Sequence, residues 1–200
     1  MQFTNIRTVQ ITSYLLLALA VTQAVYTGLY LAQITVPRQF LWGMEGVLFT
    51  VLIAFSGAAM VQAKSSQVGW AAIAFSAVLN VVQVSVGLSM FVPFREAANQ
   101  LEALGPLAGA VVAFSFMVYY AAKLLLGLAA LTFGLAKMND GAKVLGGLTA
   151  LVGIVAMLAN ATLIVFGRSA FLPSAVAGGT GVLATLLLAL CLMNVAREDK

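Results

Sequence analysis

The stretch FMVYYAAKLLLGLAALTFG, from Phe116 to Gly134, decides the fold of this chain. It holds a single charged residue, Lys123, in a run that is otherwise uncharged and mostly apolar. An apolar run of about 20 residues is the length that an α-helix needs to cross a bilayer, whereas the strands of a membrane barrel need only about 10 residues. The stretch therefore predicts a transmembrane helix, and its buried ammonium group requires an explanation.

The composition of the whole chain predicts that its solvent is lipid. Of 200 residues, 62% are hydrophobic and 8% are charged, against roughly 25% charged residues in a soluble domain. Apolar segments fall at about 10–34, 40–62, 68–91, 108–136, 144–166 and 174–195. Backbone polar groups in lipid must be satisfied within a segment. We therefore predict an all-α polytopic membrane protein with six transmembrane helices and short loops, forming one transmembrane domain over 1–200.

The longest connection, VPFREAANQLEALGP (92–106), has a helical pattern of its own. Pro93 suits a first helical turn, and apolar residues recur at helical spacing as far as Leu104 while charged and amide residues fill the other face. We predict a short amphipathic helix over about 93–104 on the outer membrane surface. Two roles stay open for it: a plain connection between two spans, or a lid over a substrate site.

Lys and Arg residues outside the predicted spans are divided unevenly between the two membrane sides. The loops on the side opposite the two chain ends contain three: Arg38, Arg95 and Arg168. The side of the amino and carboxyl ends contains six: Arg7, Lys64, Lys137, Lys143, Arg197 and Lys200. Positive loops stay in the cytoplasm. The count predicts a cytoplasmic (inner) membrane protein with both termini in the cytoplasm.

The chain has no histidine and one cysteine, Cys191. These numbers exclude a histidine-ligated haem or zinc ion, a histidine general base, and a paired-cysteine redox motif within the chain. Its few Lys and Arg residues do not cluster with aromatic residues as a nucleic-acid surface requires. We therefore expect a protein that is not an enzyme, binds no metal or cofactor, contacts the lipid bilayer and binds no nucleic acid.

Polar residues recur three or four positions apart in segments 10–34 and 68–91, so each set occupies one helix face. The first set includes Gln23 and the second includes Ser76. Two interpretations stay open: hydrogen bonds between helices worth about 0.6 kcal/mol each, or the lining of a site for a neutral or weakly polar small molecule. The candidate ligand-binding residues, taken from these faces and from the face of Lys123, are Tyr26, Tyr30, Gln33, Asn80, Gln83, Tyr119 and Lys123.

Two charged residues, Lys123 and Glu45, fall inside predicted spans. At 1.5 Å per residue, Lys123 lies roughly 21 Å from the outer boundary and Glu45 roughly 8 Å from it. The difference of about 13 Å argues against a direct ion pair. A charge at the bilayer centre costs about 2.5–3.5 kcal/mol on insertion scales, which makes such residues functional candidates.

Several interpretations of these two charges stay open. Lys123 snorkels to the cytoplasmic interface, or it presents a paired or substrate-facing ammonium, and an outward shift of its overlong span brings it nearer the membrane centre. Glu45 is a possible ion or charge site, and the two residues are successive stations on one path. Alternatively, Glu45 is an interfacial group beside Trp42 that water reaches.

Small residues four positions apart let helices approach closely in lipid. In the first predicted span they are Ala20, Ala24 and Gly28, and in the last they are Ala175 with Gly179, or alternatively Ala177 with Gly181. These faces favour either helix packing within the chain or contact with other membrane subunits.

Two functions follow from the sequence. The first is an integral membrane protein that binds or transports a small solute through a polar site between the first, third and fourth spans. The alternative is a non-catalytic accessory or structural subunit of a larger membrane complex. The polar faces and Lys123 favour the first function, whereas the scarcity of polar groups and the small-residue faces favour the second.

Overall fold

The computed structural model describes residues 5–34, 38–63, 65–167 and 171–198, with side chains as far as Met193. Its elements are α1 (Asn5–Leu31), α2 (Arg38–Gln62), α3 (Gln67–Gln100), η1 (Glu102–Leu104), α4 (Gly105–Asn139), α5 (Lys143–Phe166) and α6 (Ser174–Glu198). These ranges contain no strand, and six helices are long and apolar enough to cross a membrane. The predicted all-α fold with six spans is confirmed, and the chain is a multi-pass membrane protein.

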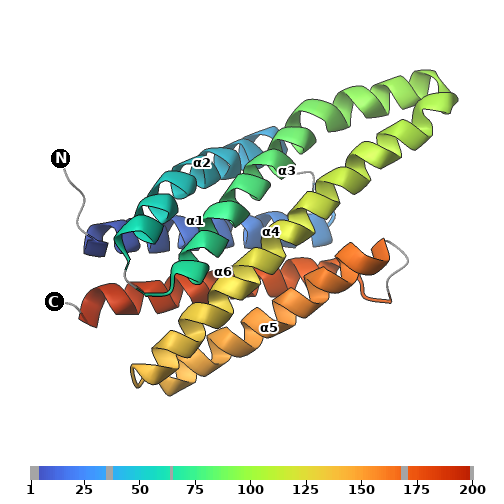
Figure 1. Ribbon diagram of the computed structural model, residues 1–200. Coiled ribbons are helices and arrows are strands. Elements are labelled where there is room, and N and C mark those ends of the chain that lie inside the picture. The colour runs from blue at the N-terminus through green and yellow to red at the C-terminus, as the bar shows by residue number, and fades with distance from the viewer. Residues whose placement is uncertain (1–4, 35–37, 64, 168–170, 199–200) are drawn as a thin grey trace.

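The six helices run alternately up and down, so the two ends of the chain meet on one side. In Figure 1, α1 begins and α6 ends at the same end of the bundle, which we call the terminal end. The turn between α3 and α4 projects from the opposite end, which we call the hairpin end. Of the basic residues that predict the orientation, the side chains of Lys64, Arg168, Arg197 and Lys200 lie outside the described residues.

Five helices form a closed ring, and the sixth lies outside it. The order of contact around the ring is α1, α2, α3, α4, α6 and back to α1, while α5 packs against α4 and α6 only. Within the described ranges, the backbones of α1 and α4 do not touch. A side chain that joins α1 to α4 must therefore cross the interior of the ring.

Residues 93–104 do not form the separate surface helix that the sequence predicts. Instead α3 continues through Pro93 to Gln100, and the single turn η1 leads into α4. Proline removes one backbone hydrogen bond, here to the carbonyl of Ser89, but Ser89 is exposed and α4 packs alongside α3. The helix therefore survives the proline, and the α3–α4 hairpin extends past the other helices (Figure 1).

Glycine pairs bring α4 and α5 into backbone contact. A Cβ atom on Gly134 would lie 2.6 Å from the nitrogen of Ala150, and one on Gly153 would lie 2.7 Å from the carbonyl oxygen of Gly127. Backbone atoms cannot rotate away as side chains can, so both positions require glycine. This is the close approach that small residues allow between helices in lipid, and it fixes α5 to the outside of the ring.

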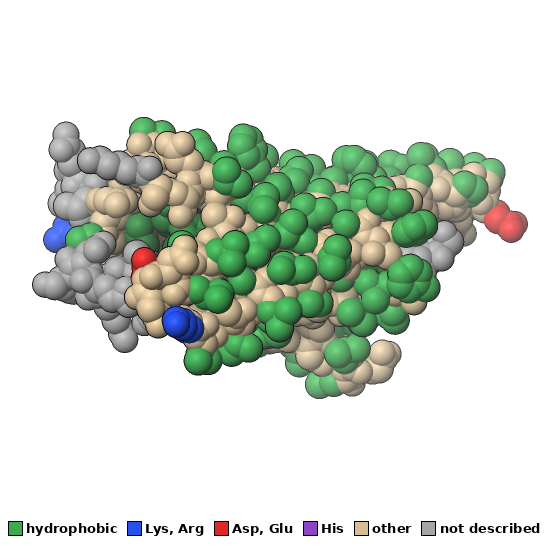
Figure 2. Space-filling model, turned by 60° about the horizontal axis from the view of Figure 1, so that its bottom comes forward, with side chains coloured by type: hydrophobic (Ala, Val, Ile, Leu, Met, Phe, Trp, Pro, Cys, Tyr) green, Lys and Arg blue, Asp and Glu red, His purple; other side chains and the backbone are tan. Residues whose placement is uncertain are grey.

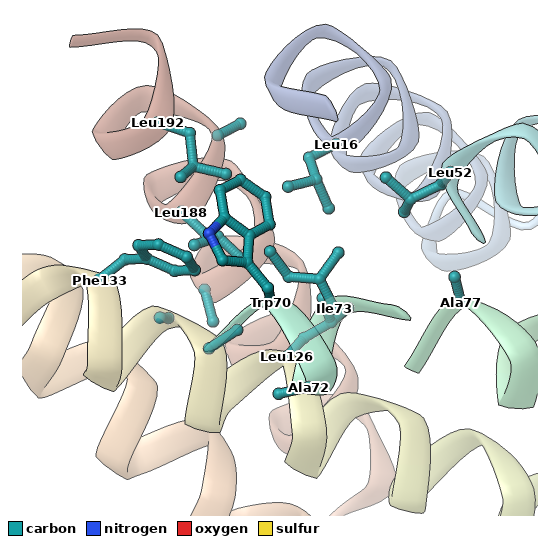
Figure 3. Close-up of a cluster of buried hydrophobic side chains, with 14 of the residues drawn as sticks. Leu16, Leu52, Trp70, Ala72, Ile73, Ala77, Leu126, Phe133, Leu188 and Leu192 are labelled. Carbon is teal, nitrogen blue, oxygen red and sulfur yellow. The ribbon is translucent and has the colours of Figure 1, made fainter. Parts of the chain in front are cut away.

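A hydrophobic cluster fills the ring toward the terminal end, and we call it the terminal core. Figure 3 shows Trp70 of α3 between side chains from α1, α4 and α6, with Phe133 meeting it edge-on. The two ring centroids are 4.9 Å apart at an interplanar angle of 71°, the arrangement that aromatic pairs prefer. The labelled members of the terminal core are Leu16, Leu52, Trp70, Ala72, Ile73, Ala77, Leu126, Phe133, Leu188 and Leu192.

The outer surface of the bundle is apolar between its two ends. Figure 2 shows hydrophobic side chains over the middle of one face, with the charged side chains of that face toward the ends. Large apolar residues such as Phe75, Leu158 and Val165 are exposed there. In water such a surface would drive aggregation, so it is a lipid-facing surface.

Candidate functional site: a buried polar layer

Lys123 lies in the interior of the ring and reaches from α4 to α1. Its side chain is 0% exposed, and Nζ donates a hydrogen bond of 2.6 Å to Oε1 of Gln23. The ammonium also lies 5.3 Å from the centroid of the Tyr119 ring, one turn earlier in α4, within the distance of a cation–π contact. Because helical side chains lean toward the amino end of their helix, the stem of Lys123 leans toward the hairpin end and meets Gln23 there.

Gly181 of α6 makes room for the stem of Lys123. A Cβ atom on Gly181 would lie 2.8 Å from Cδ of Lys123, 3.0 Å from Cγ and 3.2 Å from Cβ. The lysine therefore lies flat against the bare backbone of α6 before it reaches α1. The hydroxyl of Tyr119 lies near Gly178, also of α6, where an added Cβ atom would be at an ordinary contact distance of 3.5 Å.

Glu45 of α2 is inside the protein and not in an interface that water reaches. Its side chain is 6% exposed, and Oε1 has no hydrogen-bond partner within the described part of the chain. The side chain of Thr22 lies beside the carboxyl group, and the carboxyl group interacts electrostatically with Lys123. The interfacial interpretation of Glu45 fails because α1 and α3 pack on either side of α2 and cover it.

The two charges interact although their backbone positions differ in depth. Gln23 directly follows Thr22, whose side chain lies beside the Glu45 carboxyl group. Gln23 is therefore at the level of Glu45, and its Oε1 atom, rather than the carboxylate, accepts the hydrogen bond from Lys123. The length of the lysine stem, about 6 Å, closes part of the depth difference. A neutral amide thus holds the ammonium, and the carboxylate acts on it across a longer distance.

Hydroxyl and amide groups of α3 and α4 continue the polar set. Ser76 donates a hydrogen bond of 2.8 Å to the carbonyl of Ala122, beside Lys123, and Asn80 Nδ2 donates to the carbonyl of Ser76 at 2.9 Å. Ser115 donates a long bond of 3.4 Å to the carbonyl of Gln83. We call these residues together the polar layer: Gln23, Glu45, Ser76, Asn80, Ser115 and Lys123, all of them buried.

An aromatic cluster covers the polar layer on the side of the hairpin end, and we call it the aromatic cap. Trp42, one turn from Glu45 in α2, packs 5.6 Å from Tyr26 of α1 and 6.0 Å from Phe91 of α3, measured between ring centroids. The Trp42 ring lies directly on Gly87, where a Cβ atom would collide with it. The guanidinium carbon of Arg38 lies 5.1 Å from the centroid of the Trp42 ring.

The polar layer is therefore closed in both directions along the ring. The aromatic cap separates it from the hairpin end, and the terminal core separates it from the terminal end. Groups that prefer water occupy the middle, and groups that exclude water lie above and below them. The aromatic cap and the terminal core are thus two apolar seals on either side of a buried polar layer.

A cavity of ≈ 620 Å³ lies near the polar layer, between α4 and the connection from α5 to α6. Its wall includes Phe116, Tyr120 and Leu163. Tyr120 packs edge-on against Tyr119, with ring centroids 5.9 Å apart at an interplanar angle of 68°. The ring of Tyr119 in turn makes the cation–π contact with the ammonium of Lys123. A pair of tyrosines thus separates this largely apolar cavity from the polar layer.

The structure brings together some of the predicted ligand-binding residues and not others. Lys123, Tyr119 and Asn80 lie in or against the polar layer, and Tyr26 belongs to the aromatic cap. Tyr30 is 62% exposed and stacks on Tyr26 from outside, 6.4 Å away. The remaining two are set apart: Gln83 is half-buried, and Gln33 is exposed beyond the end of α1 with a positive φ of 58°.

Four residues that the sequence did not single out as site residues complete the arrangement. Gln23 belonged to the predicted polar face, and its position one turn before Tyr26 was the available signal. Trp42, Phe91 and Gly181 gave no such signal, because their roles depend on which helix each one meets. Only the order of the helices around the ring supplies that information.

The small-residue faces divide between packing inside the chain and exposure outside it. Ala20 and Ala177 are buried, as is Gly181 against Lys123. On Gly28 and Gly179, an added Cβ atom would meet nothing within 4 Å. Their neighbours in the predicted stripes, Ala24 and Ala175, are exposed as well.

No protein-family model, curated protein or solved structure matches this chain. The geometry of its own residues therefore carries the functional argument.

Proposed function

We propose that this membrane protein binds or transports a small solute, and that the polar layer inside the helix ring is its solute site. The observation that carries this proposal is the full burial of Lys123, whose ammonium is held by the neutral amide of Gln23 and not by a carboxylate. A lysine held in this way keeps donor capacity, since an ammonium has three N–H groups. A solute with acceptor groups fits that capacity.

The energetic cost of the polar layer supports a function for it. Replacing buried charges that interact with each other by apolar residues is often neutral or stabilising by about 1–4 kcal/mol. A bundle that needed only to hold its helices together would gain from leucine at 45 and 123. Ionisable residues inside a membrane are for this reason functional candidates, and these two lie within one ring.

The seals around the polar layer suggest how a solute reaches it. The aromatic cap consists of side chains from three different helices, so a small separation of α1 from α2 and α3 opens it. The cavity behind Tyr119 and Tyr120 offers a second approach from the hairpin end. The terminal core is the thicker seal, and it closes the opposite side.

A stability screen with matched variants tests the proposal. The purified chain in lipid nanodiscs is exposed to small neutral and weakly polar solutes, and a rise in unfolding temperature reports binding, since a ligand at 100 times its Kd stabilises the folded state by about 2.7 kcal/mol. Lys123→Ala and Gln23→Ala, which remove side-chain groups of the polar layer, are expected to lose the rise. Lys143→Ala and Gln100→Ala, which change exposed residues of the same types, are expected to keep it. Binding that survives in both Lys123→Ala and Gln23→Ala refutes the proposal.

The second candidate function is that of an accessory subunit, and the exposed small-residue faces favour it. Gly28 and Gly179 have open space beside them, and a partner helix would fill such a space closely. Gly28→Leu and Gly179→Leu would then disrupt a complex in native membranes while leaving the isolated chain stable. Gly57→Leu is the control, because Gly57 also has open space beside it but belongs to neither face.

We further propose that the protein lies in the cytoplasmic membrane with both termini in the cytoplasm, and that it acts without catalysis or a cofactor. The distribution of Lys and Arg supports the orientation. The absence of histidine from the sequence and the separation of the two buried charges support a role in binding and not in catalysis, which needs an acid–base pair at hydrogen-bond distance from the substrate.

A further inference from the structure

The carboxyl group of Glu45 combines three features that no structural role requires. It is nearly fully buried, its Oε1 atom lacks a hydrogen-bond partner among the described residues, and it lies within electrostatic reach of a buried ammonium. Burial favours the neutral acid, whereas a nearby positive charge favours the carboxylate. The two influences oppose each other, so the group can exist in either protonation state.

We propose that Glu45 is the site at which this chain takes up and releases a coupling proton, with Lys123 as its fixed counter-charge. This inference rests on the proposed function and names the ion that accompanies solute binding. In the uptake step, an O–H bond of a hydronium ion at the hairpin end breaks and an O–H bond forms at Oε1, so the carboxylate becomes a carboxylic acid and a water molecule is left. Release is the reverse.

The neighbours of Glu45 fit a proton and not a metal cation. The ionisable groups that face it are Lys123 and Tyr119 of α4, with Tyr26 of α1 one turn further toward the hairpin end in the aromatic cap. On α3, the apolar side chain of Val84 packs against Gly46, the residue that follows Glu45. The ammonium of Lys123 repels a metal ion, and the described residues hold no group of three His, Cys, Asp or Glu side chains that would bind one.

The described contacts of Glu45 offer few oxygen atoms to a hard cation. The hydroxyl of Thr22 donates to the carbonyl of Leu19 at 3.0 Å, Oε1 of Gln23 accepts from Lys123, and the phenol of Tyr119 is the other neighbouring oxygen group. Hard cations take six or more oxygen ligands. A proton needs one, and Oε1 of Glu45 is that one.

Protonation changes the charge of the polar layer and so links the proton to the solute. With Glu45 ionised, the charges of Glu45 and Lys123 cancel. With Glu45 neutral, Lys123 is the one remaining charge of the polar layer, and a solute with an acceptor or anionic group replaces the carboxylate as its counterpart. Electrostatic interactions are strong where water is excluded, so proton uptake and solute binding favour each other.

Trp42 reports on this site because it lies one turn from Glu45 in the aromatic cap. The chain has two tryptophans, and Trp70→Phe leaves Trp42 as the single emitter. In nanodiscs without solute, we expect Trp42 emission to change with pH in one transition. Glu45→Gln is expected to abolish the transition, whereas Glu96→Gln, at an exposed carboxylate of α3, is expected to keep it. Lys123→Met is expected to move its midpoint to higher pH, because the charge that favours the carboxylate is gone.

Two further measurements make the experiment decisive. Replacing sodium by choline at constant ionic strength is expected to leave the transition unchanged. Should Trp70→Phe fail to fold, the infrared band of protonated carboxyl groups in the unmodified chain gives the same titration, and Glu45→Gln identifies the band. A transition that persists in Glu45→Gln, or that depends on sodium, or the absence of any transition, overturns the proton site.

Failure of this inference is distinguishable from failure of the proposed function. If Glu45 does not titrate but Lys123→Ala abolishes the solute-induced rise in unfolding temperature, the solute site stands and the proton site falls. If Glu45 titrates but no solute stabilises the chain, the proton site stands and the solute site falls.

Discussion

Gly181→Ala tests the geometry of the polar layer most directly, because the added methyl group meets one defined side chain. A Cβ atom there would lie 2.8 Å from Cδ and 3.0 Å from Cγ of Lys123. If the lysine stem stays in place, overpacking costs about 1–3 kcal/mol. If it moves away, Nζ leaves Gln23, and a hydrogen bond to a charged group is worth about 1.5–3 kcal/mol. Both routes lower the free energy of unfolding by a similar amount.

Gly179→Ala is the matched control for this substitution. It lies on the same helix, and its added Cβ atom meets nothing within 4 Å. Alanine in place of glycine favours a helix by about 1 kcal/mol at both positions, so this gain cancels when the two variants are compared. We expect Gly181→Ala to be less stable than Gly179→Ala by about 1–3 kcal/mol.

A double-mutant cycle assigns the effect to Lys123. Lys123→Ala removes Cγ and Cδ, so Gly181→Ala should cost much less in that background, with a coupling energy of about 1–3 kcal/mol. The free energies come from equilibrium unfolding in mixed micelles, followed by tryptophan fluorescence. The reasoning is refuted if Gly181→Ala and Gly179→Ala have equal stability, or if the cost of Gly181→Ala is the same with and without the lysine side chain.

Three other predictions follow from the helix contacts. Gly134→Leu places a side chain against the backbone of α5 and is expected to lower the free energy of unfolding by more than the roughly 1–3 kcal/mol of ordinary overpacking. Gly57→Leu, with open space beside it, is expected to lower it little. Equal unfolding temperatures for the two variants would contradict the close approach of α4 and α5. Gln23→Leu removes the acceptor of a buried ammonium and is expected to cost about 1–3 kcal/mol, most of which Lys123→Met recovers in the double variant; strictly additive unfolding energies would show that the two residues do not meet. A cysteine in place of Ser66 is expected to react with an impermeant maleimide only from the cytoplasmic side, and labelling from the outer side alone would reverse the predicted orientation.

The sequence was sufficient for the fold because each span carries its own signal. Apolar length alone predicts a membrane helix, and the helices begin and end within a few residues of the predicted segments except at the end of α3. There Pro93 predicted the start of a separate helix, but α3 packs against α4 and continues through the proline. Local pattern predicts where a helix is able to end, and packing decides whether it does.

The site was only partly predictable, for a related physical reason. The periodicity of polar residues identifies an inward face, so it placed Lys123, Tyr119 and Asn80 on the inner side of their helices, but it does not identify the neighbour that the face meets. Counting residues gave a depth difference of about 13 Å between Lys123 and Glu45, and it ignored the lean of the lysine stem and the amide of Gln23. Tyr30 and Gln33 shared the periodicity of Gln23, yet they extend past the aromatic cap.

The hydrogen bond from Lys123 to Gln23 has a consequence for how the chain is assembled in the membrane. The two residues are 100 positions apart, so α1 has entered the bilayer long before α4 is synthesised. The ammonium of α4 finds its acceptor only if α1 has stayed near the place where α4 inserts. A chain whose first helix drifts away or inserts in the wrong direction leaves a bare positive charge in lipid. This one contact therefore links the stability of the inserted fourth helix to the placement of the first.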